Sequence, residues 1–395
     1  HQNNQTPTQR LNMSNEEVHV VMLPWSAFGH MIPFFQLSVA LARSRVRVSY
    51  VSTPRNISRL PGIPSGLENL LTFVELPLPT LDALNGGEAT VDLPSEKIQH
   101  LKVAYDLLKQ PFEELLAGLS PDWVVVDTIP HWAAEVASVK QAKLIYFSVY
   151  SASTLVFLGN PECLVGEGRK RLRPSWESMT SPPQWVDFPS KVTYMKHEAV
   201  LMHPGVYEVN ASGVSDAERA FKVLTSCQAV AIRSCPELEA DYLHLLGKIT
   251  GKPVIPIGLL LPEEEKKPDV SIASSEGIFR WLDGKDTKTV VYVCFGSEFK
   301  LSKEHVYEIA YGLELSGLPF LWALRRPDWA SNDSEALPQG FVDRTYGRGH
   351  VYFGWAPQTE ILSHRAIGGT LFHSGWGSII ESLEHGHALV LLPFI

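Results

Sequence analysis

Residues 18–34 read VHVVMLPWSAFGHMIPF, and this stretch changes character twice. Its first six residues are apolar apart from one histidine, which predicts a strand that is buried on both faces. A loop of small residues follows, and PFFQLSVALAR (33–43) has the spacing of apolar side chains that an amphipathic helix needs. A buried strand, a loop and a covering helix form the repeating unit of a parallel α/β sheet.

The same unit recurs along the chain in two series. Residues 46–53 (VRVSYVST), 122–127 (DWVVVD) and 142–148 (AKLIYFS) are further apolar runs of the first series. The second series has an amphipathic helix at 303–316 and consists of the runs 289–297, 319–325, 350–355, 368–374 and 388–394. We therefore predict an α/β fold with two Rossmann-like, doubly wound domains that face a cleft.

The length of 395 residues also favours two domains over one core. We expect residues 1–17 to be a disordered leader and residues 18–250 to be the first domain. GKPVIPIGLLLPEEEKKPDV (251–270) combines prolines, glycines and a charge run, as an interdomain linker does, so the second domain should span 271–395. Weak periodicity in 155–225 indicates helices and loops beside the cleft.

The composition excludes several classes of protein. Apolar residues make up 45% and charged residues 19% of the chain, and the net charge is −9, which fits a well-packed globular protein without a nucleic-acid partner. No apolar run reaches the roughly eighteen residues of a membrane span. The four cysteines fit neither a zinc site nor a disulfide framework, and with no signal peptide in view we expect a cytoplasmic monomer.

Two residues at the predicted cleft suggest acid–base chemistry. His30 lies on the loop between the first strand and its helix, where the helix N-terminus favours the neutral imidazole that a general base requires. Asp127 closes the strand DWVVVD and could orient that imidazole. Each has a structural alternative: His30 as a helix cap, and Asp127 as the start of an Asx turn through Thr128.

The segment HSGWGSIIE (373–381) lies between a predicted strand and a short helix. Its small residues, Ser374, Gly375 and Gly377, would let a ligand approach the backbone, and N–H groups at the helix start suit a phosphate. His373 could donate a further hydrogen bond. The alternative is a capping box, because Ser378 and Glu381 stand three residues apart.

The chain has neither a GxGxxG nor a GxxxxGK[ST] motif, and it has no D-x-D pair to hold a metal diphosphate. A Rossmann oxidoreductase is therefore disfavoured, and we expect no metal and no bound cofactor. Trp355 follows a predicted strand and offers a flat face on which a base could stack, although it could equally be a core residue.

Taken together, WAPQTEILSH (355–364), Gly368, Gly369, HSGWGSIIE, Gly386 and Pro393 resemble the C-terminal signature box of plant family-1 UDP-dependent glycosyltransferases. SAFGHMIP (26–33) is similar to that family's N-terminal catalytic loop, and VCFGS (293–297) is similar to the head of its second domain. The resemblance implies the two-domain GT-B fold, an inverting transfer and a UDP-sugar as the donor.

The resemblance also implies roles for single residues. His30 matches the base that deprotonates the acceptor hydroxyl, and Asp127 matches its partner. Trp355 matches the residue that stacks on uracil, and Glu381 matches the residue that grips the ribose. The remaining donor-site positions match Ser297, Ala356, Gln358, His373, Gly375, Trp376, Gly377 and Ser378.

The sequence departs from the family pattern in two ways, and the first departure narrows the expected donor sugar and acceptor. HSGWGS has Gly377 where the family commonly has Asn, and it resembles the subgroup that elongates a sugar on an existing glycoside, including rhamnosyltransferases. We therefore expect transfer from UDP-rhamnose or UDP-glucose to a flavonoid, terpenoid or steroidal glycoside, with a bare aglycone as the alternative acceptor. Segments 80–90 and 150–205 should line the acceptor site.

The second departure is at the end of the sequence. After Ile395 the family pattern continues into a sugar-binding Asp/Glu-Gln pair and further helices, so the second domain is expected to be incomplete. An inactive truncated nucleotide-binding product stays open as a third interpretation, beside the two kinds of transferase.

Overall fold

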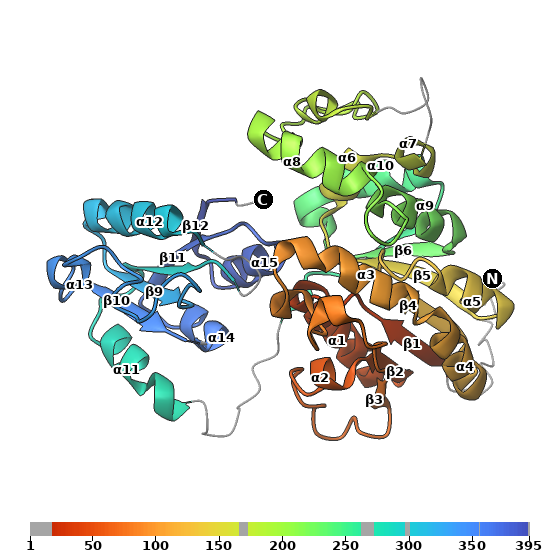
Figure 1. Ribbon diagram of the computed structural model, residues 1–395, viewed down its shortest axis with the longest axis horizontal. Coiled ribbons are helices and arrows are strands. Elements are labelled where there is room, and N and C mark those ends of the chain that lie inside the picture. The colour runs from red at the N-terminus through yellow and green to blue at the C-terminus, as the bar shows by residue number, and fades with distance from the viewer. Residues whose placement is uncertain (1–17, 166–172, 262–271, 297–300, 355, 394–395) are drawn as a thin grey trace, which may run out of the picture.

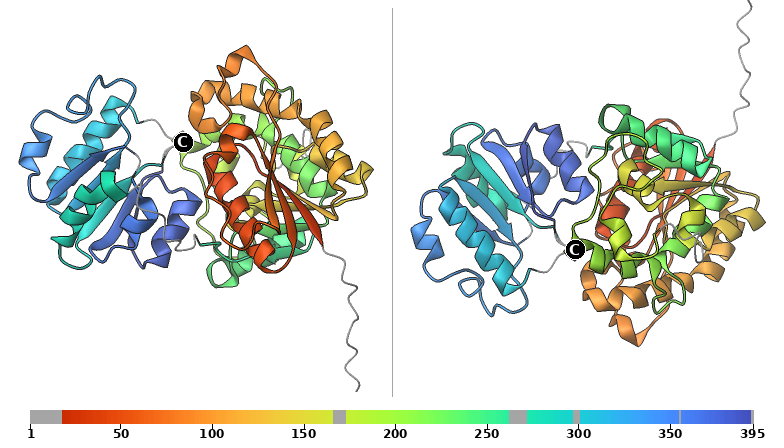
Figure 2. Two further views of the ribbon diagram at one scale, coloured as in Figure 1. Left: turned by 90° about the horizontal axis from the view of Figure 1, so that it is seen from below. Right: turned by 90° about the horizontal axis from the view of Figure 1, so that it is seen from above.

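A computed structural model describes residues 18–165, 173–261, 272–296, 301–354 and 356–393. Two lobes are visible, each built on one sheet, and helix α15 lies on the side of the second lobe that faces the first (Figure 1). Views from below and above show the same separation into two lobes (Figure 2). The expected pair of α/β domains is therefore present.

The first sheet has seven strands in the order β3-β2-β1-β4-β5-β6-β7, and every neighbouring pair is parallel. Parallel neighbours need crossover connections, which the helices of this domain provide. The strands are β1 (His19–Leu23), β2 (Arg47–Ser52), β3 (Leu71–Glu75), β4 (Trp123–Val126), β5 (Lys143–Ser148), β6 (Ala229–Ile232) and β7 (Val254–Pro256).

Both faces of this sheet are buried, as the apolar runs predicted. Along β1, Val21 and Leu23 belong to one core, while Val20 and Met22 belong to the core on the opposite face. This alternation is the two-residue period of a strand. The helices and 3₁₀ turns of the domain are α1 (Phe28–Arg43), α2 (Pro54–Ile57), η1 (Asp82–Leu84), η2 (Thr90–Asp92), η3 (Ser95–Lys97), α3 (Ile98–Asp106), α4 (Lys109–Leu119), α5 (Ala133–Val139), α6 (Ala152–Leu158), α7 (Pro161–Val165), η5 (Trp176–Met179), α8 (Lys196–Tyr207), α9 (Asp216–Ser226) and α10 (Pro236–Thr250).

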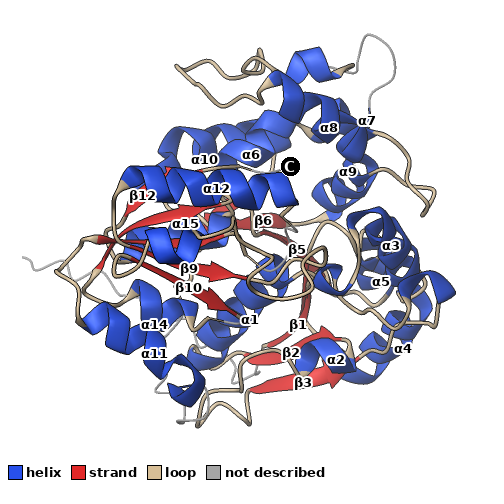
Figure 3. Ribbon diagram, turned by 60° about the vertical axis from the view of Figure 1, so that its left-hand side comes forward, coloured by secondary structure: helices blue, strands red, loops and turns tan. Residues whose placement is uncertain are grey.

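The second sheet has five parallel strands in the order β10-β9-β8-β11-β12. Figure 3 shows β9 and β10 side by side, with α12 on one side of them and α11 and α14 on the other. Helices α12 and α13 contribute to the core on one face, and α11 and α14 contribute to the core on the other. The elements are α11 (Ile272–Asp283), β8 (Val290–Cys294), α12 (Lys303–Ser316), β9 (Phe320–Leu324), α13 (Phe341–Arg344), β10 (Gly349–Phe353), α14 (Gln358–Leu362), β11 (Ile367–Phe372), α15 (Trp376–Glu384) and β12 (Ala388–Leu391).

The sequence patterns missed three strands, and one of them lies in the segment that we expected to be the interdomain linker. The strands β3, β6 and β7 have three to five residues each, too few for a clear period. Of these, β7 lies inside 251–270, so the first sheet extends to Pro256, into the segment that we expected to be linker. Pro256 is tolerated because β7 is an edge strand.

Each sheet reverses its strand order at one place, and loops after the strands at such a switch point form the usual ligand crevice of an open α/β sheet. In the first sheet this place lies between β1 and β4, and in the second it lies between β8 and β11. The loops after β4, β8 and β11 carry Asp127, Gly296 and His373, and His30 lies in the first turn of α1, the helix that follows β1. The topology therefore selects the same loops that the motifs had selected.

The backbone around Gly368 in the second sheet leaves no room for a side chain. The pairing of β11 with β8 is irregular between Ile367 and Gly369. A Cβ atom on Gly368 would lie 2.3 Å from the backbone carbonyl oxygen of Lys288, which cannot move as a side chain could. Gly312 on α12 has no atom within 4 Å of the corresponding position.

Gly368→Ala should therefore lower the free energy of unfolding by about 1–3 kcal/mol, because the added methyl group overpacks the sheet. The matched change Gly312→Ala should raise it by up to about 1 kcal/mol, because alanine is the better helix former. Urea unfolding followed by circular dichroism measures both. Equal stability of the two variants would contradict the assignment of Gly368 to a closed position.

Candidate active site

Four polar side chains follow the carboxyl ends of four adjacent strands in the first sheet. His30 comes after β1, Asp127 after β4, Tyr150 after β5 and Arg233 after β6. Because parallel strands end at one edge of a sheet, these residues share the side of the domain where open α/β folds bind ligands. Sequence reasoning had found the first two of them and missed Tyr150 and Arg233.

His30 and Asp127 are in direct contact. His30 Nδ1 lies 2.6 Å from Asp127 Oδ2, and the two side chains are 12% and 2% exposed. His30 is the third residue of α1, whose N-cap is Ala27, so the alternative of a helix-capping histidine does not hold. An ionised carboxylate only accepts hydrogen bonds, so Nδ1 carries the proton and Nε2 keeps its lone pair.

Nε2 of His30 faces the hydroxyl group of Tyr150 at 3.2 Å, and the two rings meet edge to face. With its lone pair, Nε2 accepts this hydrogen bond from the phenol. Tyr150 is 43% exposed, so the contact is made at an open surface and not in a sealed core. An incoming hydroxyl group could take the place of the phenol and donate to Nε2 in the same way.

Asp127 is fixed from three directions. Besides the imidazole of His30, Oδ2 accepts from the backbone N–H of Trp25 at 3.3 Å, and Oδ1 accepts from the N–H of Thr128 at 2.6 Å. The contact with Thr128 was the structural alternative for this aspartate, and it exists together with the contact to His30. Two backbone donors hold the carboxylate so that it can orient the ring.

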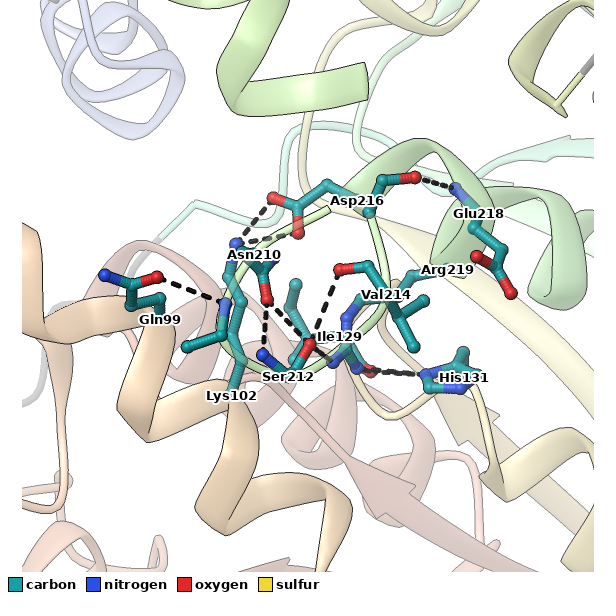
Figure 4. Close-up of polar contacts among 12 residues, drawn as sticks. Gln99, Lys102, Ile129, His131, Asn210, Ser212, Val214, Asp216, Glu218 and Arg219 are labelled. Atoms are coloured by element: carbon teal, nitrogen blue, oxygen red, sulfur yellow. Dashed lines mark hydrogen bonds and ion pairs between the residues drawn. The ribbon is translucent and has the colours of Figure 1, made fainter. Parts of the chain in front are cut away.

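A buried arginine supports the loop that follows Asp127. Arg219 on α9 donates from Nη1 to the carbonyl oxygen of Ile129 at 2.8 Å and from Nη2 to Ser212 at 2.7 Å, and Nη1 also lies 3.0 Å from Nδ1 of His131 (Figure 4). Both of its terminal nitrogens also bond the carboxylate of Asp106, at 2.7 and 2.5 Å. The fully buried guanidinium thus ties the loop at 129–131 to α3 and α9.

In the second domain His373 is held between two glycines. A Cβ atom on Gly296 would lie 2.8 Å from Cε1 of the imidazole, and one on Gly375 would lie 2.7 Å from Nε2. The small residue at 375 was expected to make room for a ligand, and the structure shows that it makes room for the histidine. Burial lowers the pKa of His373, so the ring is neutral at pH 7.

The N-terminus of α15 presents polar groups without partners. Gly375 is the N-cap and supplies no side chain, so no described side chain caps the first turn. Nδ1 of His373 and Oγ of Ser374 are buried and lack a hydrogen-bond partner among the described residues. Free amides together with unpartnered buried polar atoms at a helix start suit an anion such as a phosphate.

The capping box proposed as an alternative for this segment is absent. Ser378 lies within the first turn of α15 and is not its N-cap. Glu381 instead accepts a hydrogen bond from Nε2 of Gln358 at 2.7 Å. Burial raises the pKa of Glu381, although Gln358 and the nearby charge of Arg233 act in the opposite direction.

Gln358 opens α14 and is oriented from both ends of its amide. Its oxygen accepts from the thiol of Cys294 at 3.5 Å, while its nitrogen donates to Glu381. Ala356, two residues earlier, packs against the core formed by α11 and α14. Gln358 and Glu381 therefore present an amide and a carboxylate side by side, an arrangement that can bind neighbouring hydroxyl groups.

The two domains touch at α15. The indole Nε1 of Trp376 donates to the backbone carbonyl oxygen of Arg233 at 2.8 Å. A Cβ atom on Gly377 would lie 3.5 Å from Nη1 of the same arginine, an ordinary contact distance. The first turn of the helix therefore lies against the loop that follows β6 of the other domain.

A cavity of about 320 Å³ opens beside Gly296, at the carboxyl ends of β8 and β9. Ligand pockets commonly start at about 300 Å³. Two of the predicted donor-site residues, Ser297 and Trp355, lie outside the described residues. Among the described residues, no three His, Cys, Asp or Glu side chains gather closely enough to hold a metal ion.

Comparison with known proteins decides the family. The model of the family described as "UDP-glucoronosyl and UDP-glucosyl transferase" matches residues 274–395, and that of the glycosyltransferase N-terminal domain matches 16–212. UDP-glycosyltransferase 91C1 of Arabidopsis thaliana is 40% identical over 381 residues, which are 96% of this chain and 80% of that protein. The chain belongs to the plant family-1 UDP-glycosyltransferases.

Other members of the UDP-glycosyltransferase family agree. Soyasaponin III rhamnosyltransferase of Glycine max is 37% identical over 97% of this chain and 80% of its own length. Anthocyanidin-3-O-glucoside rhamnosyltransferase of Petunia hybrida is 34% identical over 96% of this chain and 79% of its own length. The family that the sequence motifs indicated is therefore confirmed.

Solved UDP-glycosyltransferase structures share the fold. A glycosyltransferase from Siraitia grosvenorii in complex with UDP superposes with a TM-score of 0.72 at 25% identity, covering 96% of this chain and 80% of that one. UGT89C1 of Arabidopsis thaliana in complex with UDP-L-rhamnose gives a TM-score of 0.69 at the same identity and coverage. The predicted GT-B arrangement of two Rossmann-like domains is confirmed.

Within the described part of the chain, no helix is both long and apolar enough to cross a bilayer.

The Arg219 contacts predict a large effect on stability. Arg219→Met should lower the free energy of unfolding by about 3 kcal/mol, because it leaves polar partners of a buried guanidinium unpaired. Arg344→Met is the matched control: Arg344 also bonds both oxygens of a carboxylate, that of Glu314, but on the surface, where ion pairs contribute little. Urea unfolding compares the two variants, and equal losses would contradict a supporting role for Arg219.

Proposed function

We propose that this protein transfers a sugar from a UDP-sugar to a hydroxyl group of a small plant metabolite, with inversion at the anomeric carbon. The observation that carries the proposal is the pair of His30 Nδ1 and Asp127 Oδ2 at 2.6 Å, which leaves a basic nitrogen on the open side of the ring. Family membership supplies the donor class, because the matched family model is one of UDP-glucosyl and related transferases.

The donor would bind at the second domain. The free first-turn amides of α15, from Trp376, Gly377 and Ser378, and the donor group of His373 would meet the negative charge of the diphosphate. Glu381 and Gln358 would take the ribose hydroxyl groups. The uracil would stack on Trp355 beside Ala356, and Ser297 would approach the phosphates. Backbone dipoles and hydrogen-bond donors can carry this charge, so we expect the reaction to need no metal.

The chemical step follows from the two halves of the site. The acceptor hydroxyl takes the place of the Tyr150 phenol and donates to Nε2 of His30. Its oxygen attacks the anomeric carbon as the proton moves to Nε2, and the bond from that carbon to the UDP oxygen breaks with its electron pair. Asp127 stabilises the imidazolium that forms. Displacement from the face opposite the leaving UDP inverts the configuration.

We further propose a glycoside as the acceptor and rhamnose or glucose as the transferred sugar. Two relatives are named as rhamnosyltransferases of soyasaponin III and of an anthocyanidin 3-O-glucoside, and the latter name is that of a glycoside. The segment that we assign to the acceptor wall lies beside the base: the N–H of Thr90 donates to the carbonyl oxygen of Ser26, on the loop that leads to His30. Assays on a glycoside and on its aglycone separate the two kinds of acceptor.

His30→Ala should lower the transfer rate by about 10²–10⁴, the usual contribution of general-base catalysis. Among the described residues, no other base is placed to accept the acceptor's proton where Nε2 of His30 does. UDP affinity should stay unchanged, because His30 has no part in the proposed nucleotide site. Release of UDP in the presence of a panel of UDP-sugars and acceptors measures activity, and calorimetry measures binding. A fully active His30→Ala enzyme would refute the mechanism, and a wild-type chain that binds UDP without transferring sugar would favour a non-catalytic nucleotide-binding protein.

Glu381→Ala should weaken UDP binding about tenfold, the value of one hydrogen bond to a charged group. The 2′,3′-dideoxy analogue of UDP cannot make that bond, so its affinity should be the same for the variant and the wild type. Glu384→Ala is the matched control, because Glu384 is an exposed carboxylate at the end of the same helix. Equal losses of affinity for UDP and for its analogue would show that Glu381 does not bind the ribose hydroxyl groups.

A further inference from the structure

Arg233 is a buried cation at the boundary between the domains. It follows β6 of the first sheet and is 3% exposed. Burial lowers the pKa of its guanidinium to about 10, and the carboxylate of Glu381 raises it, so the group is charged at pH 7. No carboxylate of a described residue lies within ion-pairing distance of it. Glu381 acts on the guanidinium only at longer range, and a buried charge without a directly paired counter-ion is costly, so this arrangement favours the binding of an anion.

Two of its three nitrogens are fixed by the first domain. Nε donates to the carbonyl oxygen of Leu259 at 2.7 Å, and Nη2 donates to that of Leu260 at 3.1 Å. Nη2 also lies 3.5 Å from the amide oxygen of Gln36 on α1, the helix that carries His30. The guanidinium plane is therefore set before any ligand arrives, and its direction is not free to vary.

The third nitrogen, Nη1, has no acceptor among the described residues. It is also not one of the sealed polar atoms that lack a partner, so it opens to accessible space. It points to the first turn of α15, since a Cβ atom on Gly377 would lie 3.5 Å from it. The unpartnered N–H groups of Arg233 and the free amides of α15 thus converge from two domains.

This convergence is electrostatically unfavourable without an anion. The N-terminus of a helix carries about half a positive charge, and a guanidinium beside it adds a full one. Nδ1 of His373 and Oγ of Ser374 are buried and unpartnered close to the same turn. An anion between Arg233 and this turn would accept hydrogen bonds from Nη1 and from the amides of α15, and it would offset the repulsion between the arginine and the helix.

We propose that Arg233 is a further donor-binding residue, through which the acceptor domain binds the phosphate of the nucleotide that the other domain holds. The inference rests on the proposed function, because it takes a nucleoside diphosphate as the ligand of α15. Gly377 is part of this arrangement: a longer side chain there would meet Nη1, so the arginine occupies the space in front of the helix.

The proposed role of Arg233 also couples nucleotide binding to the contact between the two domains. Its carbonyl oxygen already accepts from Trp376 Nε1 across the boundary. A phosphate bonded by both Nη1 and the amides of α15 would add a second link at the same place. The filled donor site would then hold the loop after β6, and with it α1 through Gln36, against the second domain.

The test compares UDP with uridine, which shares the base and ribose but has no phosphate. Calorimetry on the full chain should show that Arg233→Gln weakens UDP binding about tenfold, as expected for loss of one charge-assisted hydrogen bond, while uridine affinity stays unchanged. Arg233→Lys keeps the charge but not the planar fork, so its UDP affinity should lie between those of the wild type and Arg233→Gln. Arg344→Gln, on the distant surface of the second domain, serves as the control for loss of one positive charge.

Each outcome decides. Equal loss of UDP and uridine affinity would show that Arg233 only supports the fold, and unchanged UDP affinity would show that it does not reach the phosphate; either result overturns the inference. If Arg233→Gln unfolds, the comparison is made with Arg233→Lys, whose loss must be confined to UDP. A wild-type chain that binds neither ligand would overturn the proposed function itself, whereas normal wild-type binding with unaltered variants overturns only the role of Arg233.

Discussion

The hydrogen bond between His30 and Asp127 is the interaction on which the proposed chemistry depends, and the topology of the first sheet produces it. The two residues are 97 positions apart in sequence, yet they follow the adjacent parallel strands β1 and β4. Parallel pairing brings the carboxyl ends of both strands to one edge, and the reversal of strand order leaves that edge uncovered. A carboxylate placed there by a buried strand can fix the proton of an imidazole placed there by a helix.

The second domain repeats this geometry with a different chemical result. The loops after β8 and β11 also meet at a reversal of strand order, but they bring together glycines, a neutral histidine and a helix start. One switch point therefore presents a base, and the other presents hydrogen-bond donors for an anion. The hydrogen bond from Trp376 to Arg233 links the two edges, and the proposed nucleotide would contact both of them.

The sequence predicted the parts of this structure that have a strong local signal. Long buried runs such as DWVVVD marked central strands, and the residues directly after them, including Asp127, could be assigned to the cleft. The strand AVAI (229–232) is only four residues long, lies apart from any strong local pattern, and is recognised in the structure by its pairing with β5 and β7. Arg233 was missed for that reason. Tyr150 was missed because its contact with His30 depends on a turn that no local pattern specifies.

The ring of His373 lies between positions 296 and 375 with no space for a Cβ atom on either side. The loops after β8 and β11 therefore cannot vary independently of each other. A side chain at either glycine would displace the imidazole, and a smaller residue at 373 would leave a gap between the two glycines. A substitution at one of these three positions is therefore tolerated only if the other two positions change with it.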